Sequence, residues 1–182
     1  MSDPASSFEL PRDDGSSFSL KDAKGKYLVL YFYPKDDTPG CTREAQAFDA
    51  AQASFAKRGA LVVGVSRDSI ERHKKFKDKY GLGLPLLSDA DSEVHKAYGA
   101  FGEKKLYGKV SVGALRSTVL IDPAGKILTR WSNVKVDGHA DAVLAALDSH
   151  LAGGPAEAPA PAKAAKKAVA KKSVAEKTVK KG

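Results

Sequence analysis

A single cysteine, Cys41, follows a loop that reads Pro34-Lys-Asp-Asp-Thr38-Pro-Gly40. Cys41 stands at the predicted first turn of a helix, where backbone N–H groups have no partner within the helix. The positive end of the helix dipole favours the thiolate form of a sulfur placed there. A thiolate is a nucleophile that oxidants convert to a sulfenic acid, so the junction predicts redox or nucleophilic chemistry at Cys41.

Other chemistries fit the residues less well. A lone cysteine in an arbitrary protein is more often a small buried hydrophobic residue than a reactive one. A cysteine–histidine hydrolase needs a histidine beside Cys41, and nothing in the pattern places one there. A disulfide reductase would carry Cys-x-x-Cys, which is absent from the sequence. One cysteine and four scattered histidines exclude the ligand spacing of a zinc finger, and no metal is expected. The histidines are interpreted as surface or core residues: His73, His95, His139 and His150.

The elements that must position Cys41 alternate between strands and helices. The continuous apolar run at 27–33 predicts a strand buried on both faces. Apolar residues three or four apart predict a helix over 42–57. Further along the chain, the patterns predict a strand at 60–65, a helix capped by Ser69 and ended by Gly81, and an extended stretch at 84–87. A short helix at 91–98 and a hairpin of 117–121 with 126–131 follow. A last helix is predicted from Gly138, with these side chains facing inward: Val143, Leu144, Leu147 and Leu151.

This order predicts an α/β fold with a mixed central β-sheet and helices on both faces. Parallel strands joined by right-handed crossovers narrow the topology, and a thioredoxin-like fold fits. A chain of 182 residues with 42% hydrophobic residues suits one globular domain. One cysteine rules out an internal disulfide. No apolar run approaches the ~20 residues of a membrane span, and no signal peptide is found, so we expect a cytoplasmic location.

The charge is uneven, which divides the chain into a domain at 1–154 and a basic tail at 155–182. The net charge is +8, and the tail holds eight lysines against two glutamates. Its Ala/Lys/Pro composition predicts disorder. The lysines of 163–181 resemble the Ala/Lys tails of linker-histone-like proteins, which implies non-specific DNA binding; a solvated tail without a partner is the alternative.

The loop spacing Pro-x-x-x-Thr-x-x-Cys is the active-site signature of the peroxiredoxin family. The string Tyr31-Phe-Tyr-Pro-Lys-Asp-Asp-Thr-Pro-Gly-Cys-Thr-Arg-Glu44 closely resembles its bacterioferritin comigratory protein (peroxiredoxin Q) subfamily. The resemblance covers about residues 7 to 150 and includes Phe18-Ser-Leu20, Tyr80-Gly-Leu82, Pro85-Leu-Leu-Ser-Asp89, Val94-His-Lys-Ala-Tyr-Gly99, Gly102-Glu-Lys-Lys-Leu-Tyr-Gly108 and Arg116-Ser-Thr-Val-Leu-Ile-Asp122.

The resemblance implies a thiol-dependent peroxidase for hydrogen peroxide and organic hydroperoxides. Cys41 would attack the peroxide and become a sulfenic acid. The Thr38 hydroxyl would hold the peroxide, and Arg116 would support the thiolate and the developing charge. No cofactor is implied.

The same resemblance assigns supporting roles. The backbone N–H of Gly40 would bind the peroxide, Pro34 would shield the sulfur from water, and Glu44 would orient Arg116. Thr38, Pro34 and Arg116 also have structural interpretations, as a helix cap, a strand end and a surface ion pair.

The sequence departs from the subfamily at the second, resolving cysteine. Many members carry it five residues after the first, where this chain has Gln46, or in the following helix at 70–80, which also lacks one. The sulfenic acid therefore needs an external reductant: a thioredoxin, a glutaredoxin, a low-molecular-weight thiol or Cys41 of another copy. We expect a monomer. The alternative function is a DNA-associated redox-sensing protein that acts through its tail.

Overall fold

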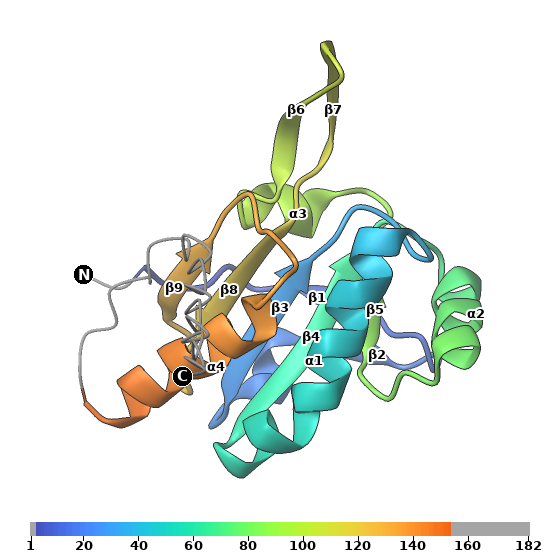
Figure 1. Ribbon diagram of the computed structural model, residues 1–182. Coiled ribbons are helices and arrows are strands. Elements are labelled where there is room, and N and C mark those ends of the chain that lie inside the picture. Colours follow the sequence, from blue (N-terminus) through green and yellow to red (C-terminus); the bar gives the residue numbers. More distant parts are fainter. Residues whose placement is uncertain (1–2, 154–182) are drawn as a thin grey trace, which may run out of the picture.

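A five-stranded mixed sheet forms the centre of the computed structural model, which describes residues 3–153 (Figure 1). Its strand order is β5-β4-β3-β8-β9. Strands β3 (Tyr27–Phe32), β4 (Ala60–Ser66) and β5 (Leu86–Ser88) run parallel. Strands β8 (Ser117–Ile121) and β9 (Ile127–Trp131) form an antiparallel hairpin on the other side of β3. The predicted mixed sheet is confirmed.

Helices and smaller elements cover both faces of this sheet. Helices α1 (Pro39–Lys57) and α4 (His139–Leu151) pack together on one face. Helix α2 (Ile70–Tyr80) lies beside the edge strand β5 (Figure 1). The other face carries the short helix α3, a 3₁₀ turn and an N-terminal hairpin, with these bounds: α3 (Glu93–Ala97), η1 (Leu20–Ala23), β1 (Glu9–Pro11) and β2 (Ser17–Ser19).

The sheet divides the core into two clusters because successive side chains of β3 point to opposite faces. Tyr31 stacks on Phe48 of α1, with ring centroids 4.7 Å apart, in the cluster that also contains Cys41. Phe32 belongs to the opposite cluster, together with Tyr98. Buried aromatic rings thus support the sheet directly behind the cysteine.

Local signals place the helix ends. Helix α1 begins at Pro39, whose fixed φ suits the first helical position, so the helix starts three residues before the predicted 42. The Ser69 hydroxyl accepts a hydrogen bond from the Arg72 N–H, and Gly81 (φ 64°) ends α2 in the left-handed region. Both predicted ends of α2 are therefore confirmed.

Two features were not predicted. One is the N-terminal hairpin with its 3₁₀ turn, and the other is a two-stranded arm of β6 (Phe101–Leu106) and β7 (Lys109–Ala114) that projects from the body (Figure 1). One prediction is wrong, because Leu151 is 47% exposed at the end of α4. The predicted tail lies outside the described residues. No helix within residues 3–153 combines the length and the apolar character needed to cross a membrane.

Candidate active site

The loop after β3 delivers Cys41 to the first turn of α1. Thr38 is the N-cap residue, and the Thr42 N–H is the first amide to donate within the helix, to the Thr38 carbonyl at 2.8 Å. The amides of Gly40 and Cys41 lie before that point, so they are available to a ligand. The cysteine is 1% exposed and has no disulfide partner in the chain.

Arg116 reaches the sulfur from the strand next to β3. It directly precedes β8, and its Nη2 lies 3.3 Å from Cys41 Sγ, within hydrogen-bond distance for sulfur. A Cβ atom at Gly40 would lie 3.1 Å from the same Nη2. Glycine at position 40 thus leaves the space that the guanidinium occupies above the start of α1.

Glu44 holds the other side of the guanidinium. It lies one helical turn after Cys41, is almost completely buried, and accepts a hydrogen bond from Arg116 Nη1. Burial raises the pKa of Glu44 to about 7, although the Arg116 charge and hydrogen bond oppose this shift. Burial lowers the pKa of Arg116, but the charges of Glu44 and Cys41 outweigh this and raise it overall. The arginine is therefore a permanent cation against the sulfur.

Thr38 and Pro34 lie at the two ends of the loop. The Thr38 hydroxyl donates to the Lys35 carbonyl at 2.9 Å and makes no capping hydrogen bond to α1. Its proton is thereby engaged, while the oxygen keeps lone pairs that can accept a hydrogen bond. Pro34 is half-buried and directly follows the buried Tyr33.

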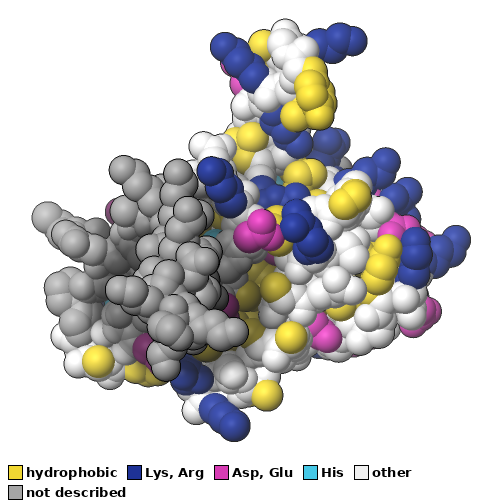
Figure 2. All heavy atoms as spheres, viewed as in Figure 1, with side chains coloured by type: hydrophobic (Ala, Val, Ile, Leu, Met, Phe, Trp, Pro, Cys, Tyr) yellow, Lys and Arg dark blue, Asp and Glu magenta, His cyan; other side chains and the backbone are white. Residues whose placement is uncertain are grey.

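Two residues near Arg116 were missed by the sequence analysis. His139, at the start of α4, lies 2.7 Å (Nε2) from the Thr118 hydroxyl, and burial together with the Arg116 charge lowers the pKa of His139 to about 4. Burial also lowers the pKa of Lys104 of β6, where Arg116 and Arg67 oppose its charge and Cys41 favours it. Figure 2 shows lysine and arginine side chains at the base of the arm. Lys104 therefore adds, near Cys41 and Arg116, a positive charge that is not part of the Pro-x-x-x-Thr-x-x-Cys signature.

The described residues contain no cluster of three or more His, Cys, Asp or Glu side chains placed to hold a metal ion. The chemistry that this arrangement can perform belongs to one sulfur, one guanidinium and the amides of a helix start. These groups stabilise a thiolate and any negative charge that develops next to it.

Comparisons with known proteins agree with this geometry. The model of the AhpC/TSA family matches residues 1–130. The peroxiredoxin Bcp of Xanthomonas campestris is 48% identical over 149 residues, covering 81% of this chain and 93% of that protein. The peroxiredoxin Bcp of Bacillus subtilis is 47% identical over 135 residues, covering 74% of this chain and 86% of that protein.

A solved structure of Xanthomonas campestris peroxiredoxin Q has a TM-score of 0.75 at 47% identity, covering 79% of this chain and 90% of that one. It supports the thioredoxin-like fold. Two other structures of that relative are Cys-to-Ser mutants at two different positions, so it has at least two cysteines where this chain has one. None of these relatives supports the DNA-associated alternative. By its family match and these identities, the chain belongs to the AhpC/TSA family and is a peroxiredoxin, a thiol-dependent peroxidase.

Proposed function

We propose that Cys41 is the peroxidatic residue and that Arg116, Thr38 and the amides of Gly40 and Cys41 form the peroxide site around it. The observation that carries this proposal is the 3.3 Å contact between Arg116 Nη2 and Cys41 Sγ. A charged donor beside the sulfur stabilises the thiolate and the negative charge that spreads over the oxygens during attack.

The oxidation step transfers one oxygen atom. The Cys41 thiolate attacks the terminal oxygen of a hydroperoxide, an S–O bond forms, and the O–O bond breaks. The leaving alkoxide or hydroxide takes up a proton to give alcohol or water, and the sulfur is left as a sulfenic acid. Thr38 accepts a hydrogen bond from the hydroperoxide O–H, because its own proton is donated to the Lys35 carbonyl.

Glu44 and Pro34 support this site without contacting the reacting atoms. Glu44 fixes the plane of the Arg116 guanidinium through the hydrogen bond from Nη1. Pro34 shields the sulfur from water, consistent with the 1% exposure of Cys41. We propose hydrogen peroxide and organic hydroperoxides as substrates. A solved Xanthomonas relative is described by its alkyl peroxide reduction activity, which supports the second class.

The return to the thiol uses an external thiol, because the chain has no second cysteine. A first thiol displaces water from the sulfenic acid to give a mixed disulfide, and a second thiol releases Cys41 and leaves as a disulfide. A thioredoxin, a glutaredoxin or a low-molecular-weight thiol can supply both thiols, whereas Cys41 of a second copy of this chain can supply only the first. We propose a monomer in the reducing cytoplasm, where such thiols are present.

Intact mass after one equivalent of hydrogen peroxide tests the proposal, with Cys41→Ser as the control. The reduced protein should gain one oxygen within seconds, and Cys41→Ser should gain none. A wild-type thiol that stays unmodified over many minutes would refute the peroxidatic assignment. Adding single thiols to the oxidised protein then identifies the reductant, and a disulfide-linked dimer would reveal reduction by a second copy.

A further inference from the structure

The active-site loop carries two consecutive aspartates, Asp36 and Asp37, that the reaction does not use. Asp36 is 2% exposed, although it is a charged residue between β3 and α1. A buried carboxylate needs partners, since an unpaired one costs several kcal/mol, about the stability of a small domain. Each aspartate has at least one partner on α2, a helix that contributes no group to the peroxide site proposed above.

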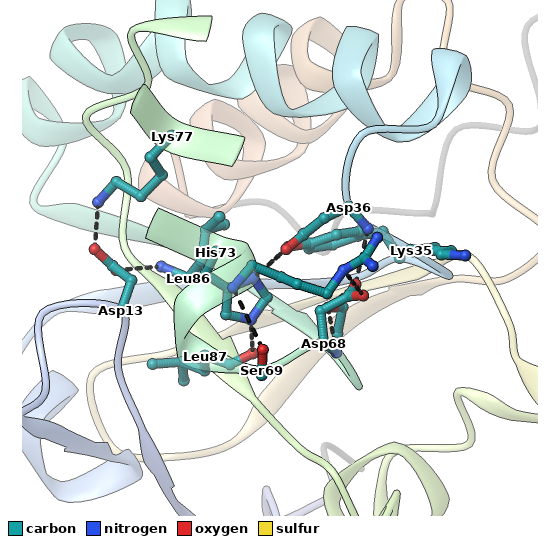
Figure 3. Close-up of polar contacts among 12 residues, drawn as sticks. Asp13, Lys35, Asp36, Asp68, Ser69, His73, Lys77, Leu86 and Leu87 are labelled. Carbon is teal, nitrogen blue, oxygen red and sulfur yellow. Dashed lines mark hydrogen bonds and ion pairs between the residues drawn. The ribbon is translucent and has the colours of Figure 1, made fainter. Parts of the chain in front are cut away.

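Asp36 is held between two buried side chains (Figure 3). Its Oδ1 accepts a hydrogen bond from the Tyr33 hydroxyl at 2.5 Å, and its Oδ2 lies 2.6 Å from His73 Nδ1. The other ring nitrogen of His73, Nε2, lies 3.0 Å from the Leu87 carbonyl of β5. Carboxylate and carbonyl oxygens are acceptors, so both ring nitrogens of His73 face acceptors, and the ring joins the loop to β5.

The backbone of the loop is held at the same place. The Asp36 N–H donates to Asp68 Oδ2 at 2.8 Å, and the Ser66 hydroxyl donates to the same oxygen at 2.8 Å. Two side chains at the end of α2 hold Asp37: Lys79 Nζ lies 2.9 Å from Oδ2, and the Tyr80 hydroxyl donates to Oδ1 at 2.6 Å. Asp37 has φ 59°, a strained value for a residue other than glycine. Such a backbone persists where its surroundings fix it.

The next residue is Thr38, so the contacts that hold Asp36 and Asp37 also determine the position of Thr38 in the peroxide site. The Thr38 hydroxyl bonds back to the Lys35 carbonyl, and the Thr38 carbonyl accepts from the first helical amide of α1, at Thr42. We propose that His73 is a positioning residue: through Asp36 it fixes the loop 34–38, and so aims Thr38 and the free amides of α1 at the peroxide. This inference rests on the proposed function of Cys41.

A second histidine–aspartate pair in the same chain serves as a matched control. His95 Nδ1 lies 2.6 Å from Asp89 Oδ2, and both side chains are as buried as the first pair. This pair spans the start of α3 on the opposite face of the sheet. Its hydrogen bonds within the described residues do not reach the loop 34–38. A purely structural role predicts equal effects for the two histidines.

The experiment compares His73→Leu with His95→Leu. The rate constant for single-turnover oxidation of Cys41 by hydrogen peroxide is measured at a temperature where urea unfolding shows both variants folded. We expect His73→Leu to be about 10- to 100-fold slower than wild type, the range that a misplacement of about 1 Å causes. His95→Leu should lose stability but stay within about twofold of the wild-type rate, because it leaves the near-attack geometry unchanged.

The conservative variant Asp36→Asn separates the position of the loop from the charge of Asp36. It also provides a test that does not depend on His73→Leu folding normally. In Asp36→Asn, the amide oxygen accepts from Tyr33 and the amide N–H donates to a neutral His73, so the geometry is restored. We expect a rate within about threefold of wild type for Asp36→Asn and a loss as large as that of His73→Leu for Asp36→Ala.

The outcomes distinguish this inference from the function on which it rests. If wild type oxidises within seconds while His73→Leu keeps its rate, or while His95→Leu slows equally, the positioning role is refuted and the peroxidatic role stands. Equal rates for Asp36→Asn and Asp36→Ala would also refute the positioning role. If wild type gains no oxygen, the proposed function fails, and this inference fails with it.

Discussion

Two buried titratable side chains near Arg116, Glu44 and His139, make opposite contributions to the pH dependence of the free energy of unfolding. Glu44 has its pKa raised from 4.5 to about 7, first by burial, with Arg116 opposing. His139 has its pKa lowered from 6.5 to about 4, first by burial and then by the charge of Arg116. Both side chains are nearly inaccessible to solvent, so solvent screening reduces these effects little.

Linkage gives the sign and the size of each contribution. The folded protein binds the Glu44 proton more tightly than the unfolded chain, so this stabilisation is complete below pH 4.5 and is lost as pH rises through about 7. The folded protein binds the His139 proton less tightly, so that stabilisation is complete above pH 6.5 and is lost as pH falls through about 4. At about 1.4 kcal/mol per pKa unit, each contribution is about 3 kcal/mol.

Urea unfolding at several pH values between 4.5 and 7 measures the balance. The wild-type free energy of unfolding should vary by less than about 1 kcal/mol, because the two slopes cancel. Glu44→Gln keeps an acceptor for Arg116 but cannot ionise, so its stability should rise by about 2–3 kcal/mol over this range as His139 of the unfolded chain deprotonates. His139→Asn should show the reverse slope.

The other carboxylates with shifted pKa values add little to the slope between pH 4.5 and 7, because their pKa values are lowered below 3.8. They are Asp14, Asp22, Asp37, Asp89 and Asp148. A Glu44→Gln profile parallel to wild type would refute the reasoning. It would mean that Glu44 stays ionised throughout because of its ion pair with Arg116.

Three further predictions concern the rate of Cys41 oxidation by peroxide, followed by intact mass in single turnover. Arg116→Gln should slow it about 100- to 1,000-fold, the usual loss for a charge-stabilising donor; an unchanged rate would remove the guanidinium from the mechanism. Thr38→Val should slow it about fivefold, since one net hydrogen bond is worth about 1 kcal/mol, whereas Thr38→Ser should keep the wild-type rate; equal losses would assign Thr38 a purely steric role. Lys104→Gln should slow it a few-fold at low salt, with a smaller difference at 1 M salt, where the screening length is about 3 Å; an effect that does not change with salt would contradict an electrostatic role.

Much of the fold was predictable because its core elements carry strong local signals. The buried strand at 27–33 and the cap and stop of α2 follow from apolar runs and from residues with special backbone preferences. The arm was missed because β6 has no alternation of apolar and polar residues and the short alternation of β7, at Val110 and Val112, lies on mostly exposed positions. Gly108 was a signal for a hairpin turn in the sequence. Tyr107 and Gly108 both adopt positive φ in the two-residue turn that joins β6 and β7.

The site divides in the same way. The loop signature and the block around Arg116 located the sulfur and its cation from the sequence. His139, Lys104 and His73 come from elements far away in the chain, and no local pattern marks a side chain whose partner lies across the fold. Leu151 fits the apolar period of α4, but it is the last residue of the helix and is 47% exposed, and tertiary context decides such end positions.

The inner and outer residue pairs of the β6–β7 arm differ in their relation to the active site. Its inner pair, Lys104 opposite Ser111, brings a positive charge to the sulfur. The outer pairs, Lys105 with Val110 and Leu106 with Lys109, end in a turn where Tyr107 is 97% exposed. Antiparallel ribbons repeat every two residues, so removing both outer pairs and closing with the same turn leaves each remaining side chain on its own face. Shortening the tip in this way would therefore keep Lys104 paired with Ser111 on the face of the ribbon that it now occupies.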